Sequence, residues 1–201
     1  TGGGSFRPGR PSGSVVFLGR PCCPSRPVLS IRGRAFVLRS QQDVPDAKTG
    51  LTPREKGLVR DTWALVRKDV KANAIAIFLT LFQRHPEYQK LFSGFADVPP
   101  EALSTNPRLG AHAMSVAYAI TSLVDSLDDA ECLVELVRKV AVNHTRRPVS
   151  VTHFENLTVV IVDTLKERLG GKMSPAAVAA WEKTLRLVVT VTADVYKEQR
   201  K

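Results

Sequence analysis

Two of the four histidines in this chain lie on the apolar faces of predicted helices. Between residues 131 and 148, apolar side chains recur at the three- and four-residue spacing of one helix face and end in a histidine: Leu133, Leu136, Val137, Val140, Ala141 and His144. The preceding predicted helix has the same spacing, with His112 on a face formed by Leu109, Ala113, Val116, Ala117 and Ile120. A buried imidazole needs a partner, because an unsatisfied buried polar group costs about 1–3 kcal/mol.

Two interpretations of these histidines remain open at this point. A single histidine such as His144 is commonly a core residue that bonds a backbone carbonyl. Two helix faces packed across a gap would instead oppose the imidazoles of His112 and His144, which could hold a flat group between them. Neutral imidazole binds iron, copper and zinc. Zinc is disfavoured here, because no Cys, Asp or Glu at ligand spacing completes a tetrahedral set.

The elements that would position these histidines are all predicted to be helices. Thr52-Pro53 with Glu55 begins a first helix over 51–69, and a second apolar helix follows over 70–85. A short helix over 86–92, a loop over 96–106, the two histidine-bearing helices, a helix from Val151 and a final helix from Ser174-Pro175 complete the chain. The sequence predicts an all-α protein of about seven helices.

The positive charge is unevenly distributed along the chain. The formal net charge is +10, but residues 1–50 contain seven Arg and one Lys against only two Asp. Residues 51–201 carry 21 basic and 17 acidic side chains, a balance that is ordinary for a globular domain. We therefore expect no nucleic-acid partner, although a basic chain invites that interpretation.

The first fifty residues differ in composition from the rest. Residues 1–50 are rich in Gly, Pro, Ser and Arg, so we expect a disordered extension followed by a single domain over 51–201. We also expect residues 1–48 to be removable without loss of helicity. The Arg- and Ser-rich, acid-poor composition resembles an organellar transit peptide, but its prolines would interrupt the amphipathic helix that such peptides use.

Cysteine content and hydropathy indicate the compartment. Cys22, Cys23 and Cys132 give an odd count, with two adjacent in sequence, which does not suggest a secreted disulfide framework. No apolar run approaches the roughly 20 residues that cross a bilayer. We expect a soluble cytoplasmic protein, with an organelle as the alternative, and assign Cys132 no role.

From Leu51 to about Lys197 the chain resembles the globin family. The resemblance is carried by Trp63 in the first helix, HPE with Pro86, Phe92 in the following corner, His112 with Val116, His144, and Trp181 in the last helix. It implies helices packed in the globin fold around a b-type haem. The pocket resembles those of neuroglobin-, cytoglobin- and invertebrate-type members.

The resemblance also implies a role for each matching residue. His144 would be the proximal iron ligand. His112 would face the other side of the iron, either donating a hydrogen bond to bound dioxygen or itself binding the iron. The remaining contacts would be made by Phe92 against the porphyrin, Phe78 and Val116 on the distal side, Val140 and Val149 or Val151 on the proximal side, and Arg146 or Arg147 at a propionate.

Two departures from the family pattern concern the distal side. Ser115 occupies a place that is often basic in globins, and Phe78 occupies one where many oxygen-storing members have Leu. Both resemble neuroglobin and favour coordination of the iron by two histidines. Five- and six-coordinate iron both remain open.

The function that the resemblance implies is reversible binding of dioxygen, without catalysis. The alternatives are a haem enzyme that acts on nitric oxide or nitrite with a reductase partner, and a haem-based ligand sensor. No flavin- or nicotinamide-binding motif follows the globin-like part, which disfavours a self-sufficient enzyme. The oligomeric state is left open.

Overall fold

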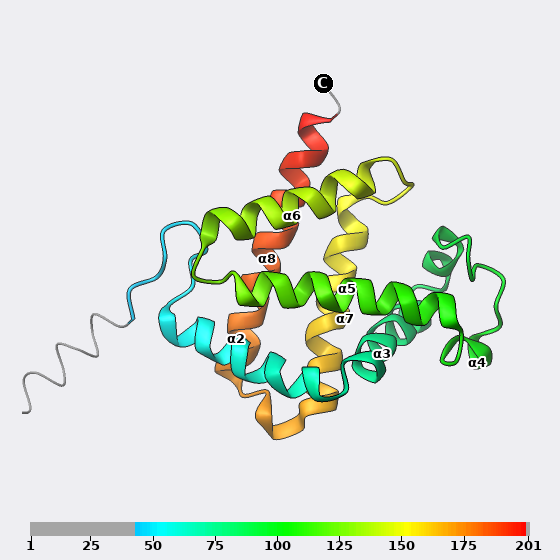
Figure 1. Cartoon of the computed structure of the whole chain (residues 1–201), viewed down its shortest axis with the longest axis horizontal. Coiled ribbons are helices and arrows are strands. Elements are labelled where there is room, and N and C mark those ends of the chain that lie inside the picture. The colour runs from blue at the N-terminus through cyan, green and yellow to red at the C-terminus, as the bar shows by residue number, and fades with distance from the viewer. Residues whose placement is uncertain (1–42, 200–201) are drawn as a thin grey trace, which may run out of the picture.

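The described part of the computed structural model covers residues 43–199 and contains seven α-helices and no strand (Figure 1). In chain order they are α2 (Pro53–Val66), α3 (Val70–Arg84), α4 (Pro100–Leu103), α5 (Pro107–Asp125), α6 (Ala130–Thr145), α7 (Val151–Leu169) and α8 (Pro175–Glu198). Three 3-10 helices, η1 (Arg67–Asp69), η2 (Pro86–Leu91) and η3 (Gly170–Lys172), join them. The predicted all-α architecture is confirmed.

The predicted helix starts are present, with their hydrogen bonds. Thr52 and Glu55 form the reciprocal capping box at α2, and Asn106 and Ser174 accept backbone N–H bonds at the first turns of α5 and α8. Two details differ from expectation. The segment after Pro86 forms the 3-10 helix η2, and the predicted loop over 96–106 contains the four-residue helix α4.

Two buried tryptophans join α2 to α8 and to α5. The Trp181 indole N–H of α8 donates to the Thr62 hydroxyl of α2 at 2.8 Å, and that of Trp63 donates to Thr121 of α5 at 3.0 Å. The ring centroids of the two tryptophans lie 5.7 Å apart. Each polar atom is therefore paired inside an apolar contact, which avoids the cost of burying it alone.

The two histidine-bearing helices lie across the rest of the bundle. In Figure 1, α5 and α6 cross α7 and α8, with α3 lying against α5 and α7. Helix α6 packs mainly on α8 and more lightly on α5. Helix α5 and the last turn of α6 both border the cavity described below.

The residues before α2 form a closed turn that is docked on the bundle. Gly50, at φ +67°, donates its N–H to the Asp46 carbonyl, and the Asp46 carboxylate accepts from the backbone N–H of Thr49. Lys48 reaches Glu131 of α6 at 2.6 Å. Most of the predicted 1–50 extension, residues 1–42, lies outside the described residues.

A buried lysine of α2 holds the same region through two nearby carboxylates. Lys56 of α2 is only 7% exposed and lies 3.8 Å from Asp46 and 3.5 Å from Asp128. Asp128, in the corner between α5 and α6, is also held by Arg60 at 2.6 Å. The start of α6 is thus anchored to α2 through this corner.

Among residues 43–199, no helix is long and apolar enough to span a membrane.

Candidate functional site

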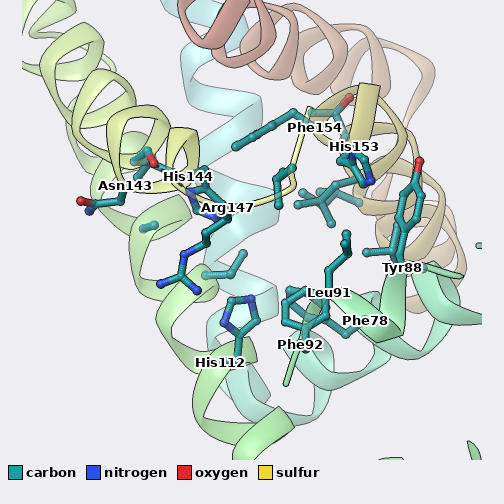
Figure 2. A pocket seen from close by; sticks show the side chains of 18 of the residues that line it. Phe78, Tyr88, Leu91, Phe92, His112, Asn143, His144, Arg147, His153 and Phe154 are labelled. Carbon is teal, nitrogen blue, oxygen red and sulfur yellow. Dashed lines mark hydrogen bonds between the residues drawn. The ribbon is translucent and has the colours of Figure 1, made fainter. Parts of the chain in front are cut away.

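A cavity of about 470 Å³ lies between the last turn of α6 and helices α3, α5 and α7 (Figure 2). His112 of α5 and His144 of α6 both line it, on opposite walls. Most of the remaining wall is aliphatic or aromatic. A volume of this order is typical of a site for an organic ligand of moderate size.

His144 is held in a single orientation by its own helix. Its Nδ1 lies 2.8 Å from the carbonyl oxygen of Val140, one turn earlier. Because a carbonyl can only accept, Nδ1 carries the proton, and in the neutral ring the lone pair is then on Nε2. The ring of Phe154 on α7 meets the imidazole edge-on, with centroids 5.2 Å apart. His144 can therefore be both a histidine bonded to a backbone carbonyl and a metal ligand, because one ring nitrogen bonds the carbonyl and the other faces no such partner.

His112 is held differently, by aromatic rings. Phe78 and Phe92 meet its imidazole edge-on, with centroid distances of 5.1 Å and 4.9 Å. Burial lowers the pKa of His112 below its ordinary value, and the nearby charge of Arg147 lowers it further. The imidazole is therefore neutral at physiological pH, so it can present either a lone pair or an N–H to the cavity.

Polar and charged side chains also line the cavity. Asn143 and Arg147 come from the end of α6 and the corner after it (Figure 2), and Arg108 comes from the first turn of α5. Arg108 donates to the Gly94 carbonyl at 3.2 Å, while Arg147 is exposed. The two arginines make the cavity wall suited to anionic groups such as carboxylates.

A further polar wall was not anticipated. Tyr88 of η2 and His153 of α7 both line the cavity, with ring centroids 4.3 Å apart. His153 also caps the start of α7, its Nδ1 accepting from the Ser150 N–H at 3.0 Å. Sequence spacing gave no signal for this pair, because the two residues are distant in the chain and Tyr88 lies in a 3-10 turn without a regular face.

The structure brings together most of the predicted site residues. Cavity-lining positions are occupied by Phe78, Phe92, His112, Val116, Val140, His144 and Arg147. Of the two alternatives on the proximal side, Val149 lines the cavity, whereas Val151 is not among its lining residues in the described chain. Val151 is instead the first residue of α7. Ser115 faces solvent and bonds the Ala111 carbonyl at 3.0 Å.

These features fit a haem group. Haem is flat, largely apolar, metal-centred and carries two carboxylates, and the cavity offers apolar walls, opposed imidazoles and arginines in its wall. Within residues 43–199, no three His, Cys, Asp or Glu side chains are grouped so as to hold a bare metal ion. The two imidazoles that face each other across the cavity are those of His112 and His144.

Comparison with known proteins agrees with this architecture. The family model described as Globin matches residues 75–192, more than half of the chain. A globin of Tritia mutabilis is 29% identical over 143 residues, which are 70% of this chain and 97% of that protein. Globin-1 of Anadara inaequivalvis is 32% identical over 146 residues, covering 72% and 96% of the two chains. Cytoglobin-1 of Oryzias latipes is 30% identical over 150 residues, covering 74% and 85%. Together with the helical fold and the opposed histidines, these matches show that the chain belongs to the globin family of haem proteins.

Proposed function

We propose that this globin binds b-type haem between His144 and His112 and uses it to bind dioxygen reversibly. The observation that carries the proposal is the 2.8 Å contact between His144 Nδ1 and the Val140 carbonyl. That hydrogen bond selects the tautomer whose Nε2 lone pair is available and increases its basicity, as it does for metal-bound histidines in general. His144 would therefore be the permanent, proximal ligand.

When bound, the haem would supply reversible binding of a diatomic ligand. His112 could then act in two ways. Its N–H could donate a hydrogen bond to a ligand that carries partial negative charge, or its lone pair could itself help to hold the iron. Because its lowered pKa keeps the ring neutral, both roles are available at physiological pH.

The walls around His112 would keep water out. Phe78 is 2% exposed, and together with Phe92 and Val116 it provides an apolar surface on the His112 side of the cavity. In such surroundings a hydrogen bond from His112 is stronger than it would be in water. Phe92 would also lie against the face of the flat group.

The arginines of the cavity wall would meet the haem carboxylates. Arg147 lines the cavity with an exposed side chain, and Arg108 is the second candidate. Arginine pairs with carboxylates through two parallel hydrogen bonds, which fixes orientation as well as charge. A b-type haem is held without a covalent bond to the protein. Cys132, the cysteine of the described residues, is exposed and does not line the cavity, which fits this kind of haem.

Absorption spectroscopy of the purified protein titrated with haem tests this proposal. The wild type should take up one haem per chain, and His144→Ala should fail to retain it. His85→Ala is the matched control, because it removes a histidine that lies outside the cavity wall. Retention of haem by His144→Ala with an unchanged spectrum would contradict the assignment of the proximal ligand.

A further inference from the structure

We propose that His153 is a positioning residue that holds Phe92, and through it His112, in place from the opposite side of the pocket. The proposal rests on the proposed function, because it concerns the histidine facing the haem. It gives a role to a histidine that caps a helix and also lines the cavity. Three successive contacts link His153 to His112.

The first contact ties His153 to the corner between α6 and α7. Its Nδ1 accepts from the Ser150 backbone N–H at 3.0 Å and lies 2.8 Å from the Ser150 hydroxyl. The same corner carries Arg147 and Val149 into the cavity wall. The imidazole of His153 is therefore fixed to the segment that directly follows the proximal histidine.

The second contact joins His153 to Tyr88. The two rings are 4.3 Å apart with an interplanar angle of 35°, and His85 stacks on Tyr88 at 4.7 Å and 14°. Asn156, one turn further along α7, donates to the Tyr88 hydroxyl at 2.7 Å. Figure 2 shows Tyr88 and His153 together on the wall away from Arg147. The tyrosine is thus held on α7 by a ring and by its hydroxyl.

The third contact links Tyr88 to His112 through Phe92. Tyr88 lies in η2, and Phe92 follows directly after that 3-10 helix. The Gln89 side chain binds the Phe95 carbonyl at 2.9 Å, which makes η2 and the following loop one unit. Phe92 meets the His112 ring at 4.9 Å. A shift of Tyr88 would therefore move Phe92 against His112.

A ring contact joins His153 to Tyr88, the backbone of η2 joins Tyr88 to Phe92, and a second ring contact joins Phe92 to His112. The path runs through the protein wall, beside the space that the haem would occupy. Such contiguity becomes functional coupling only when a change at one end alters the other end. The test must therefore separate the ring of His153, which contacts Tyr88, from its nitrogen, which caps α7.

Two substitutions make that separation. His153→Gln keeps the capping box with Ser150, because Gln at this position can accept the same N–H bond, but it removes the ring. His153→Phe keeps a ring against Tyr88 and removes the cap. The melting temperature should follow the cap, so it should stay near the parental value in His153→Gln and fall in His153→Phe. If His153 acted only as a helix cap, the azide affinity described next would also stay near the parental value in His153→Gln and change in His153→Phe.

The distal readout is the affinity of the ferric, haem-loaded protein for azide. We expect His153→Gln to change it by about threefold or more and His153→Phe to leave it within about 1.5-fold of the parent. A weaker azide complex would mean that His112 stabilises the ligand, and a tighter one that His112 competes with it. An unchanged affinity in His153→Gln, or an equal change in both variants, would overturn the proposal.

The same substitution in a His112→Leu background shows whether the effect passes through His112. There, His153→Gln should change azide affinity by less than about 1.5-fold, because contacts that act through one residue are not additive. An equal effect in both backgrounds would overturn the proposal. Failure of the parent to take up haem would contradict the proposed function and this inference together. Normal haem uptake without coupling would contradict this inference alone.

Discussion

The two histidines of the cavity are held by different kinds of contact. His144 is fixed by a 2.8 Å hydrogen bond to the carbonyl of Val140 on its own helix. His112 is held by the edges of Phe78 and Phe92. A hydrogen bond to the backbone fixes both the tautomer and the direction of a ring. Aromatic packing restricts the ring but leaves either nitrogen free to face the cavity.

We propose that this difference corresponds to a separate task for each side of the site. His144 would hold the haem iron permanently, and His112 would make a contact that forms and breaks. The predictions below test that asymmetry at its strongest and weakest points.

The largest effect is expected from removing the aromatic support of His112. Phe78 is 2% exposed and contacts Phe82, Phe92 and His112, so Phe78→Ala should lower the free energy of unfolding by about 3–5 kcal/mol. Urea unfolding of the haem-loaded protein measures this loss. Tyr118→Ala is the control, since that side chain is 61% exposed and its loss should cost less than about 0.5 kcal/mol. Similar losses in the two variants would contradict the account.

The next effect concerns the ligand rather than the fold. His112→Leu removes a hydrogen bond to a partly charged ligand, typically worth about 1.5–3 kcal/mol. Dioxygen loss or autoxidation should therefore be faster by roughly one to two orders of magnitude, since each 1.4 kcal/mol is about tenfold. Stopped-flow and absorption measurements give both rates. Two unchanged rates would show that His112 does not contact the ligand.

A third prediction concerns the anchor of the helix that carries His144. Removal of residues 1–42 should leave stability and haem uptake unchanged. Removal of residues 1–50 should lower the free energy of unfolding by about 1–3 kcal/mol, because buried Lys56 loses Asp46 and α6 loses the contact between Lys48 and Glu131. Urea unfolding of both truncated chains measures the two free energies of unfolding. Equal stability would show that the turn contributes nothing.

The smallest expected effect is the pH dependence of the stability contributed by Asp46 and Asp128. Backbone hydrogen bonding from Thr49 lowers the pKa of Asp46, and the Arg60 side chain lowers the pKa of Asp128. A carboxyl with a lowered pKa stabilises the fold above its unfolded-state pKa, and this contribution is lost as pH falls through the folded-state pKa. Stability should therefore decline below about pH 4.

Asp128→Asn should remove part of that decline, by less than about 1 kcal/mol, because this carboxylate is largely exposed. Urea unfolding of wild type and variant at pH 3 to 7 measures the difference. A variant whose acid dependence matched that of the wild type would exclude Asp128 from this role.

Much of this organisation could be predicted from sequence. His144 and His112 fall on apolar helix faces because helical spacing is periodic, and Thr52, Asn106 and Ser174 begin helices because their side chains can accept the free N–H groups. These signals are local. They predicted where the helices lie and which faces are buried.

The parts that sequence reasoning missed depend on contacts between distant segments. Tyr88 and His153 are 65 positions apart, and no periodic pattern brings them together. The docked turn at Asp46 could not be anticipated either, because nothing in the sequence marks its partner Lys56 as a buried lysine. The choice between Val149 and Val151 depends on where the corner ends and α7 begins, and helix boundaries are poorly defined by sequence.

The most direct test of the central asymmetry is the absorption spectrum of the reduced, ligand-free protein in His112→Leu and His144→Leu. If His144 is the permanent ligand, His112→Leu should retain one haem and give a five-coordinate ferrous spectrum, while His144→Leu should lose the haem or bind it weakly. Retention by His144→Leu with loss from His112→Leu would reverse the assignment, and a six-coordinate spectrum in His112→Leu would show that another residue binds the iron.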